Sequence, residues 1–149
     1  MEPVADGRSV IQCRMPYFEW SQDLSVNVKE IDDEHRVLIG MINTLNEAML
    51  AHKGREAQKA TIDAMVDYAA THFATEERYM QAFHYQGYPA HRVEHQKFTA
   101  KALELKTRAD NSTFILTLEI VTFLRSWLQN HIMGTDKRYQ TCFNEHGLR

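Results

Sequence analysis

Four long segments of this chain repeat apolar residues at steps of three and four, a period typical of helices that each bury one face. In the second segment the inward positions include Ile62, Met65, Ala69 and Met80. The connecting loops are short, and no segment alternates in the two-residue period of a strand. The predicted helices cover about residues 32–52, 56–83, 89–108 and 113–133, followed by a short helix over about 136–144. We therefore predict an all-α fold, an up-down-up-down antiparallel four-helix bundle with an N-terminal arm and a short C-terminal helix.

The chain opens with a stretch that prolines and a glycine interrupt, so we assign residues 1–16 to an N-terminal extension. Residues 17–149 then form one bundle domain, which is long enough to bury a core. The aromatic cluster Tyr17-Phe18-Glu19-Trp20 is expected to pack an arm onto the bundle. Asp32 is the predicted N-cap of the first helix.

Charge and hydropathy exclude several classes of protein. The net charge is −3, and no basic stripe indicates a nucleic-acid partner. No apolar run is long enough for membrane insertion, and the first residues lack the apolar centre of a secretory signal. Cys13 and Cys142 are the only cysteines, so we expect reduced thiols and a cytoplasmic location. A disulfide between these two ends of the chain stays open as an alternative.

Polar residues interrupt the apolar face of the second helix. His72 and Glu76 lie four residues apart, so both project from the same face about one turn apart. A carboxylate on an inward face is costly to bury unless it is paired or bound to a metal. This pair therefore indicates either a buried ion pair or a metal site.

The other predicted helices place similar residues inward. His35 begins the apolar face of the first helix, and His91 and His95 repeat the four-residue spacing in the third. His131 ends the inner face of the fourth helix, and the intervening glycine lets Asp136 turn back toward the same level. A single inward histidine is more often a hydrogen-bonded core residue than a ligand. Because these residues come from all four helices to one level of one bundle, we interpret them as a metal site.

The remaining histidines have no matching partner. His52, His84 and His146 lie at helix ends or in the tail, so we expect them to face solvent. Glu77 points away from the apolar face and is expected to be a surface charge.

The donor set favours two iron ions over one zinc ion. Seven ligands are too many for one tetrahedral ion, whereas imidazole with carboxylate suits iron. Two six-coordinate irons offer about twelve positions, of which five imidazoles, two bridging carboxylates and one bridging oxygen fill about eleven. The count predicts an oxo- or hydroxo-bridged di-iron centre with one open position for a small ligand.

These residues lie in motifs that resemble a known family. The chain resembles the bacteriohemerythrins, the bacterial branch of the hemerythrin family of non-haem di-iron oxygen-binding bundles, over about residues 20–143. The matching motifs are Ile31-Asp32-Asp33-Glu34-His35, His72-Phe73-Ala74-Thr75-Glu76-Glu77, His91-Arg92-Val93-Glu94-His95-Gln96-Lys97-Phe98 and Trp127-Leu128-Gln129-Asn130-His131-Ile132-Met133-Gly134-Thr135-Asp136. Asn27 stands where the family often has glycine, a mild departure because Asn tolerates left-handed backbone.

The resemblance implies a division of the ligands between the two irons. His91, His95 and His131 would bind one iron, His35 and His72 the other, and Glu76 and Asp136 would bridge both. The open position would belong to the two-histidine iron. The resemblance also places an apolar lining around the oxygen site, formed by Leu38, Phe73, Phe98, Trp127, Leu128 and Ile132.

The function that the resemblance implies is reversible dioxygen binding, for carriage, storage or delivery, as hydroperoxide on the two-histidine iron. The net charge of the centre is then unchanged on binding, because the bridge proton moves to the bound peroxide, and this avoids the cost of a new buried charge. We expect a monomer that is not an enzyme and whose partner is dioxygen, and delivery of that dioxygen to an oxygen-using enzyme stays open as one of its roles. A di-iron oxidase or peroxidase, or an oxygen or nitric-oxide sensing or detoxification protein of the same fold, stays open as an alternative.

Overall fold

The computed structural model describes residues 15–111, 113 and 115–149. Most of the predicted extension over 1–16, including Cys13, lies outside these residues. The helices are α1 (Lys29–Leu50), α2 (Arg55–Ala82), α3 (Tyr88–Ala109), α4 (Leu118–Gly134) and α5 (Gln140–Glu145), with single 3-10 turns η1 (Gln22–Leu24) and η2 (Asp136–Tyr139).

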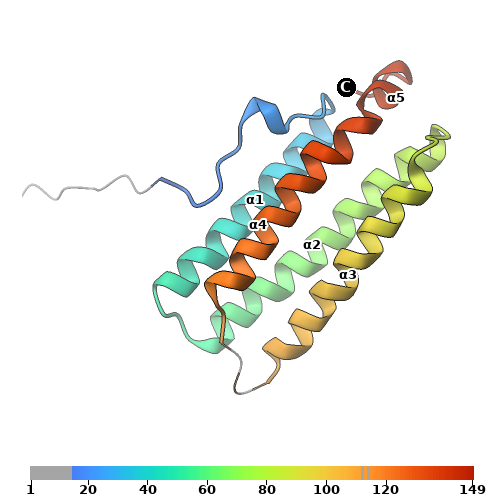
Figure 1. The fold of residues 1–149 in the computed structure, drawn as a ribbon. Helices are drawn as coiled ribbons and strands as arrows, with labels where there is room; N and C mark the ends of the chain where they lie inside the picture. The colour runs from blue at the N-terminus through green and yellow to red at the C-terminus, as the bar shows by residue number, and fades with distance from the viewer. Residues whose placement is uncertain (1–14, 112, 114) are drawn as a thin grey trace, which may run out of the picture.

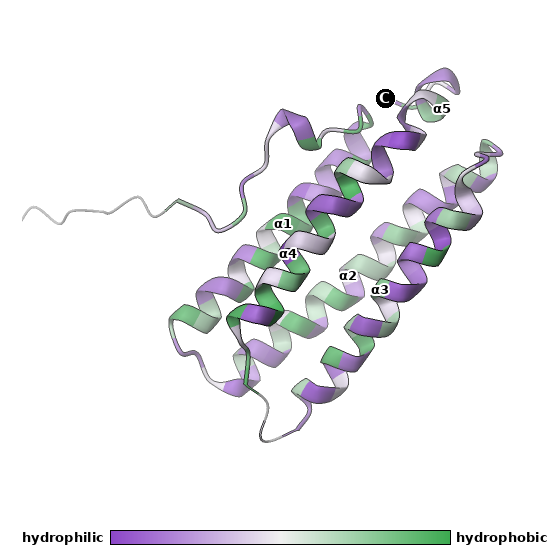
Figure 2. Cartoon of the chain, viewed as in Figure 1, coloured by the Kyte–Doolittle hydropathy of each residue, from purple (hydrophilic) through white to green (hydrophobic). Residues whose placement is uncertain are grey.

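The four long helices form the predicted antiparallel bundle (Figure 1). Around the bundle α1 packs against α2 and α4, and α2 packs against α3. Along each helix, hydrophobic and hydrophilic residues recur at intervals of about one helical turn (Figure 2). This is the pattern that apolar residues at three- and four-residue steps produce. One apolar core runs through the interior and includes Ile31, Leu45, Ile62, Val121 and Leu124. The fold prediction is confirmed.

An N-terminal arm lies along the outside of α1 and α4 (Figure 1). The backbone N–H of Phe18 donates to Asn43 Oδ1 at 2.8 Å, and Asn43 Nδ2 donates back to the Phe18 carbonyl at 2.8 Å. The Phe18 ring is buried, and the Arg36 guanidinium lies 4.3 Å from the ring centre of Trp20. The aromatic cluster therefore packs the arm onto the bundle as predicted.

Two predicted helix starts are wrong. Asp32 is not an N-cap, because α1 begins at Lys29 and Asp32 lies inside the helix. Its buried carboxylate instead accepts from Ser25 Oγ at 2.6 Å and from the Val26 N–H at 2.8 Å, which ties the arm to the helix. The fourth helix begins at Leu118 rather than near residue 113, because the Thr117 side chain caps it by accepting from the Ile120 N–H.

Two histidines end helices in left-handed backbone. His52 follows α1 with φ of 49°, and His84 follows α2 with φ of 52°. After each, the next residue donates its N–H to a carbonyl five residues earlier, from Lys53 to Ala48 and from Tyr85 to Met80. This is the Schellman arrangement, in which glycine is the usual residue. Asn27 also has positive φ, 55°, which agrees with its predicted tolerance of that conformation.

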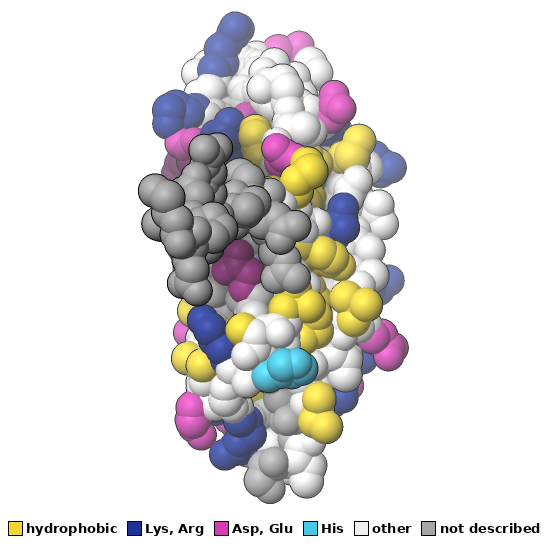
Figure 3. Space-filling model, turned by 90° about the vertical axis from the view of Figure 1, so that its left-hand side faces the viewer, with side chains coloured by type: hydrophobic (Ala, Val, Ile, Leu, Met, Phe, Trp, Pro, Cys, Tyr) yellow, Lys and Arg dark blue, Asp and Glu magenta, His cyan; other side chains and the backbone are white. Residues whose placement is uncertain are grey.

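The surface carries charges of both signs. On the face drawn in Figure 3, acidic and basic side chains are interspersed with hydrophobic ones, and histidine takes up only a small area. No helix among the described residues combines the length and apolarity needed to cross a membrane.

Candidate metal centre

The bundle brings the seven predicted ligands together in its interior. His35 comes from α1, His72 and Glu76 from α2, His91 and His95 from α3, His131 from α4, and Asp136 from the first residue of η2. Each of them is at most 3% exposed. Because α4 ends at Gly134, the chain turns between His131 and Asp136, as the sequence predicted.

Five of these residues form a first group around three imidazoles. His95 Nε2 lies 3.1 Å from both His91 Nε2 and His131 Nε2. Glu76 Oε2 lies 3.0 Å from His95 Nε2. Asp136 Oδ1 lies 3.1 Å from His91 Nε2 and 3.0 Å from His131 Nε2. We call this the three-histidine group.

A second group uses the other oxygen of each carboxylate. Asp136 Oδ2 lies 3.1 Å from His35 Nε2. Glu76 Oε1 lies 3.4 Å from His72 Nε2 and 3.7 Å from His35 Nε2. In this two-histidine group and in the three-histidine group, all donor atoms lie within 4.8 Å of one another. Glu76 and Asp136 therefore offer one oxygen to each group, as bridging ligands would.

The donor atoms fit cations better than they fit one another. His95 and His131 each direct Nδ1 at a carboxylate, which assigns the ring proton to Nδ1 and leaves a lone pair on Nε2. Two such lone pairs only 3.1 Å apart repel unless a proton or a metal ion lies between them. Among the described residues, Glu76 Oε2, both Asp136 oxygens and both ring nitrogens of His35 have no hydrogen-bond partner despite their burial.

The spacing in the three-histidine group also matches a six-coordinate ion. Adjacent ligands at bonds of about 2.1 Å lie about 3.0 Å apart in an octahedron and about 3.4 Å apart in a tetrahedron. The closest contacts in the three-histidine group are 3.0 and 3.1 Å. Imidazoles with two carboxylates are also a donor set that suits iron. The residues therefore fit two iron ions, although their role as iron ligands stays a prediction.

Carboxylates behind the histidines were missed by the sequence interpretation. Glu34 Oε2 accepts from His72 Nδ1 at 2.7 Å, and Glu94 Oε2 accepts from His131 Nδ1 at 2.9 Å. Thr75 donates its hydroxyl to Glu34, and Thr135 donates its hydroxyl to Glu94. These outer carboxylates fix each ring's tautomer and orientation, as they commonly do for metal-bound histidine.

The prediction for Glu77 is wrong. Its side chain is only 23% exposed, and Oε1 accepts from His95 Nδ1 at 2.9 Å. Glu77 belongs to a different helix from His95, so its position beside the apolar face could not show this pairing. The nearest sequence signal is that Glu34, Glu77 and Glu94 each lie next to a predicted ligand.

The carboxylates and imidazoles shift one another's pKa in the metal-free site. Burial by itself lowers the pKa of His35, but Asp136 and Glu76 outweigh it and raise that pKa to about 9. The same balance raises the pKa of His91 to about 10. Burial and the Glu76 charge act to raise the pKa of Asp136, yet the surrounding imidazoles hold it well below its usual range. In the metal-free site, protonated imidazoles therefore pair with carboxylates of opposite charge. A bound metal ion would replace the protons of those imidazoles.

The sequence interpretation also missed Tyr139. Its side chain is fully buried, and its hydroxyl donates to Glu76 Oε1 at 2.7 Å. Burial, together with the charges of Asp136 and Glu76, raises the pKa of Tyr139 well above its usual value, so the phenol stays protonated.

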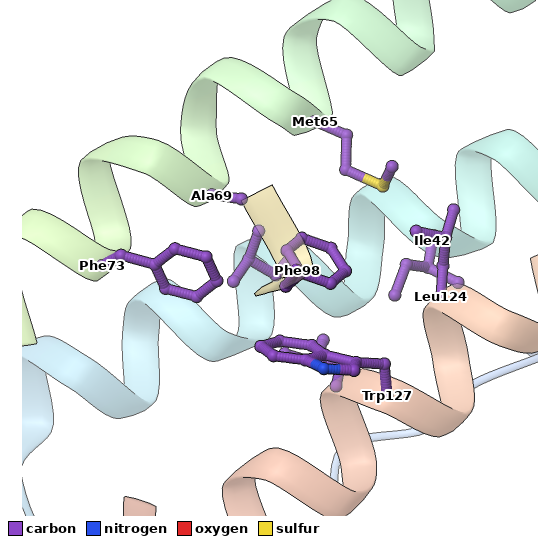
Figure 4. A pocket seen from close by; sticks show the side chains of 9 residues that line it. Ile42, Met65, Ala69, Phe73, Phe98, Leu124 and Trp127 are labelled. Atoms are coloured by element: carbon purple, nitrogen blue, oxygen red, sulfur yellow. The ribbon is translucent and has the colours of Figure 1, made fainter. Parts of the chain in front are cut away.

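An apolar cavity lies beside the centre, and Figure 4 shows the side chains that line it. Five of the six predicted lining residues surround it, namely Leu38, Phe73, Phe98, Trp127 and Leu128, together with Ile42, Met65, Ala69 and Leu124. Ile132 is fully buried and is not among the residues that line this cavity, and its place beside the oxygen site stays a prediction. The space open to the centre of a water-sized sphere is about 20 Å³. That is enough for roughly one small molecule.

Aromatic rings separate this cavity from the three-histidine group. The Phe73 ring stacks on His95 with centroids 3.9 Å apart, and Trp127 stacks on His131 with centroids 4.5 Å apart. Phe98 stacks on Trp127 at 4.1 Å, which joins α3 to α4.

The three histidines that were predicted to face solvent, His52, His84 and His146, are exposed.

Comparisons with known proteins agree with this geometry. A family profile described as "Hemerythrin HHE cation binding domain" matches residues 26–142. The chain is 30% identical to a bacteriohemerythrin of Methylococcus capsulatus over 87% of its length and 99% of that protein. It is 35% identical to a bacteriohemerythrin of Stenotrophomonas maltophilia over 89% of its length and 85% of that protein. A crystal structure of wild-type hemerythrin superposes with a TM-score of 0.81 at 31% identity, covering 85% of this chain and 97% of that one.

Proposed function

The chain belongs to the hemerythrin family, and from this we propose that it binds dioxygen reversibly at a non-haem di-iron centre. His91, His95 and His131 would hold one iron, His35 and His72 the other, and Glu76 and Asp136 would bridge the two. Two ferrous ions bound there would supply the electrons for reversible reduction of dioxygen.

The observation that carries this proposal is the shared carboxylate pair. Glu76 and Asp136 each face both histidine groups, and the two groups differ by one imidazole. A centre with unequal histidine numbers leaves a position for a small ligand on the side with fewer donors. This supports binding at the two-histidine iron, the position that the sequence analysis expects to stay open.

The apolar cavity supports binding rather than turnover. Leu38 and Ala69 lie one turn from His35 and His72, and Phe98 and Leu128 lie one turn from His95 and His131, so the cavity lies about one turn along the bundle from both groups. Every residue that lines the cavity is apolar. With no ionisable side chain in the lining, the cavity offers no proton donor to a bound oxygen species. We infer a carrier, storage or delivery protein rather than an oxidase or peroxidase.

An anaerobic oxygen titration of the reduced, iron-loaded protein tests the proposal. We expect about two irons per chain and an absorption band that appears with oxygen and bleaches on its removal. The variant Glu76→Ala should lose most of the iron, whereas the matched control His84→Ala, at an exposed helix end, should retain it. Irreversible oxidation with continuous oxygen consumption would favour an enzyme, and an iron content near zero would refute the centre.

A monomeric state, delivery to an oxygen-using enzyme and a cytoplasmic location stay predictions from the sequence. They need solution measurements of mass, partner binding and cell fractionation.

A further inference from the structure

The four oxygens of the shared carboxylates are not equivalent. Within the described part of the chain, Glu76 Oε2 and both oxygens of Asp136 have no hydrogen-bond partner. Glu76 Oε1 is the exception, because it accepts the Tyr139 hydroxyl at 2.7 Å. One of the two bridging carboxylates is therefore asymmetric before any metal binds.

The Tyr139 hydroxyl is held firmly in this position. The ring is fully buried and stacks between Phe143, with centroids 4.2 Å apart, and His91, with centroids 5.6 Å apart. Tyr139 and Asp136 are the two ends of η2, so one short turn supplies both a bridging carboxylate and the hydroxyl that caps the other. Such a ring cannot turn its hydroxyl away without disturbing the stack.

The capped oxygen faces the two-histidine group. Oε1 is the Glu76 oxygen near His72 and His35, whereas Oε2 lies near His95 and His91. A carboxylate oxygen that accepts a hydrogen bond has less electron density to donate to a cation. Tyr139 therefore weakens the Glu76 ligand on the side that already has fewer imidazoles.

We propose that Tyr139 is a positioning residue that makes the two metal positions unequal, so that the three-histidine position fills first and the two-histidine position fills last and empties first. The inference rests on the proposed function only in requiring that both positions bind metal. It predicts that the two-histidine position is the first to lose its iron when iron is scarce.

Titration of the metal-free, full-length protein with Co²⁺ tests this inference. Calorimetry should resolve two binding events, and visible absorption should report the coordination of each. In Tyr139→Phe the second event should strengthen relative to the first, by about tenfold, the equivalent of a hydrogen bond to a charged group. A ring-fluorinated tyrosine at position 139 is a stronger donor and should widen the gap between the two events.

Tyr79→Phe is the matched control. Tyr79 lies one turn after Glu76 on α2, but its hydroxyl donates to Glu30 outside the centre, so the gap between the two events should not change. Two equal events in the wild type, or an unchanged gap in Tyr139→Phe, would overturn the inference. If Tyr139→Phe does not fold, the fluorinated protein decides, and an unchanged gap there overturns the inference as well. Binding of fewer than two Co²⁺ ions by the wild type would instead refute the proposed two-metal centre.

Discussion

Metal affinity should depend on the three carboxylates behind the histidines in the order of their burial. The side chains of Glu34, Glu77 and Glu94 are 17%, 23% and 44% exposed. Each accepts from the Nδ1 of a different histidine, at 2.7, 2.9 and 2.9 Å. The perturbation is a Glu→Gln replacement at each position, which keeps the size and an acceptor oxygen but removes the charge.

The size of the effect follows from solvent screening. Loss of such an outer partner typically costs about 10- to 100-fold in metal affinity, or about 1.4–2.8 kcal/mol. A charge nearer to solvent is screened more and contributes less. We therefore expect Glu34→Gln to be near the upper end, Glu77→Gln intermediate and Glu94→Gln near the lower end. Glu34 serves His72, so its loss should weaken the two-histidine position, whereas the others should weaken the three-histidine position.

Competition between the protein and a calibrated chelator for Co²⁺ measures these affinities. Glu104→Gln is the control, because Glu104 is exposed and pairs only with Lys101 among the described residues. The reasoning fails if Glu94→Gln has the largest effect, or if all three variants match the Glu104→Gln protein.

Three further predictions concern stability. Asp32→Ala should destabilise the fold by about 2–3 kcal/mol in urea unfolding, because it leaves the buried Ser25 hydroxyl and a backbone N–H without their acceptor, and iron content per folded chain should not change. His52→Gly should raise the free energy of unfolding by up to about 1 kcal/mol, since glycine removes the cost of positive φ, and an unchanged or lower value would contradict the left-handed assignment. In the metal-free protein, the raised pKa values of His35 and His91 stabilise the fold fully below their ordinary value of 6.5, and this contribution is lost as the pH rises toward about 9 and 10. Urea unfolding across that range should therefore show a decline that the metal-loaded protein lacks, because bound metal replaces the protons.

The sequence predicted the bundle and the assembly of its inner residues because both depend on local periodicity. His72 and Glu76 share a face at any four-residue spacing in a helix, whatever the partners are. The helix boundaries were less accurate where a cap competed with the pattern, since the Thr117 side chain caps the fourth helix and it begins at Leu118 rather than near residue 113. Asp is a common residue at helix N-caps, but the Asp32 carboxylate instead accepts a hydrogen bond from the Val26 N–H of the arm.

What the sequence by itself determined is which residues face the interior, and hence the set of seven candidate ligands. Only the tertiary structure decided how they pair, because the pairing joins side chains from different helices. Glu77 with His95, Glu94 with His131 and Tyr139 with Glu76 are all contacts between different elements of the fold. Helical period fixes direction around one axis, whereas these contacts depend on the relative rotation and height of two packed helices, which no single segment encodes.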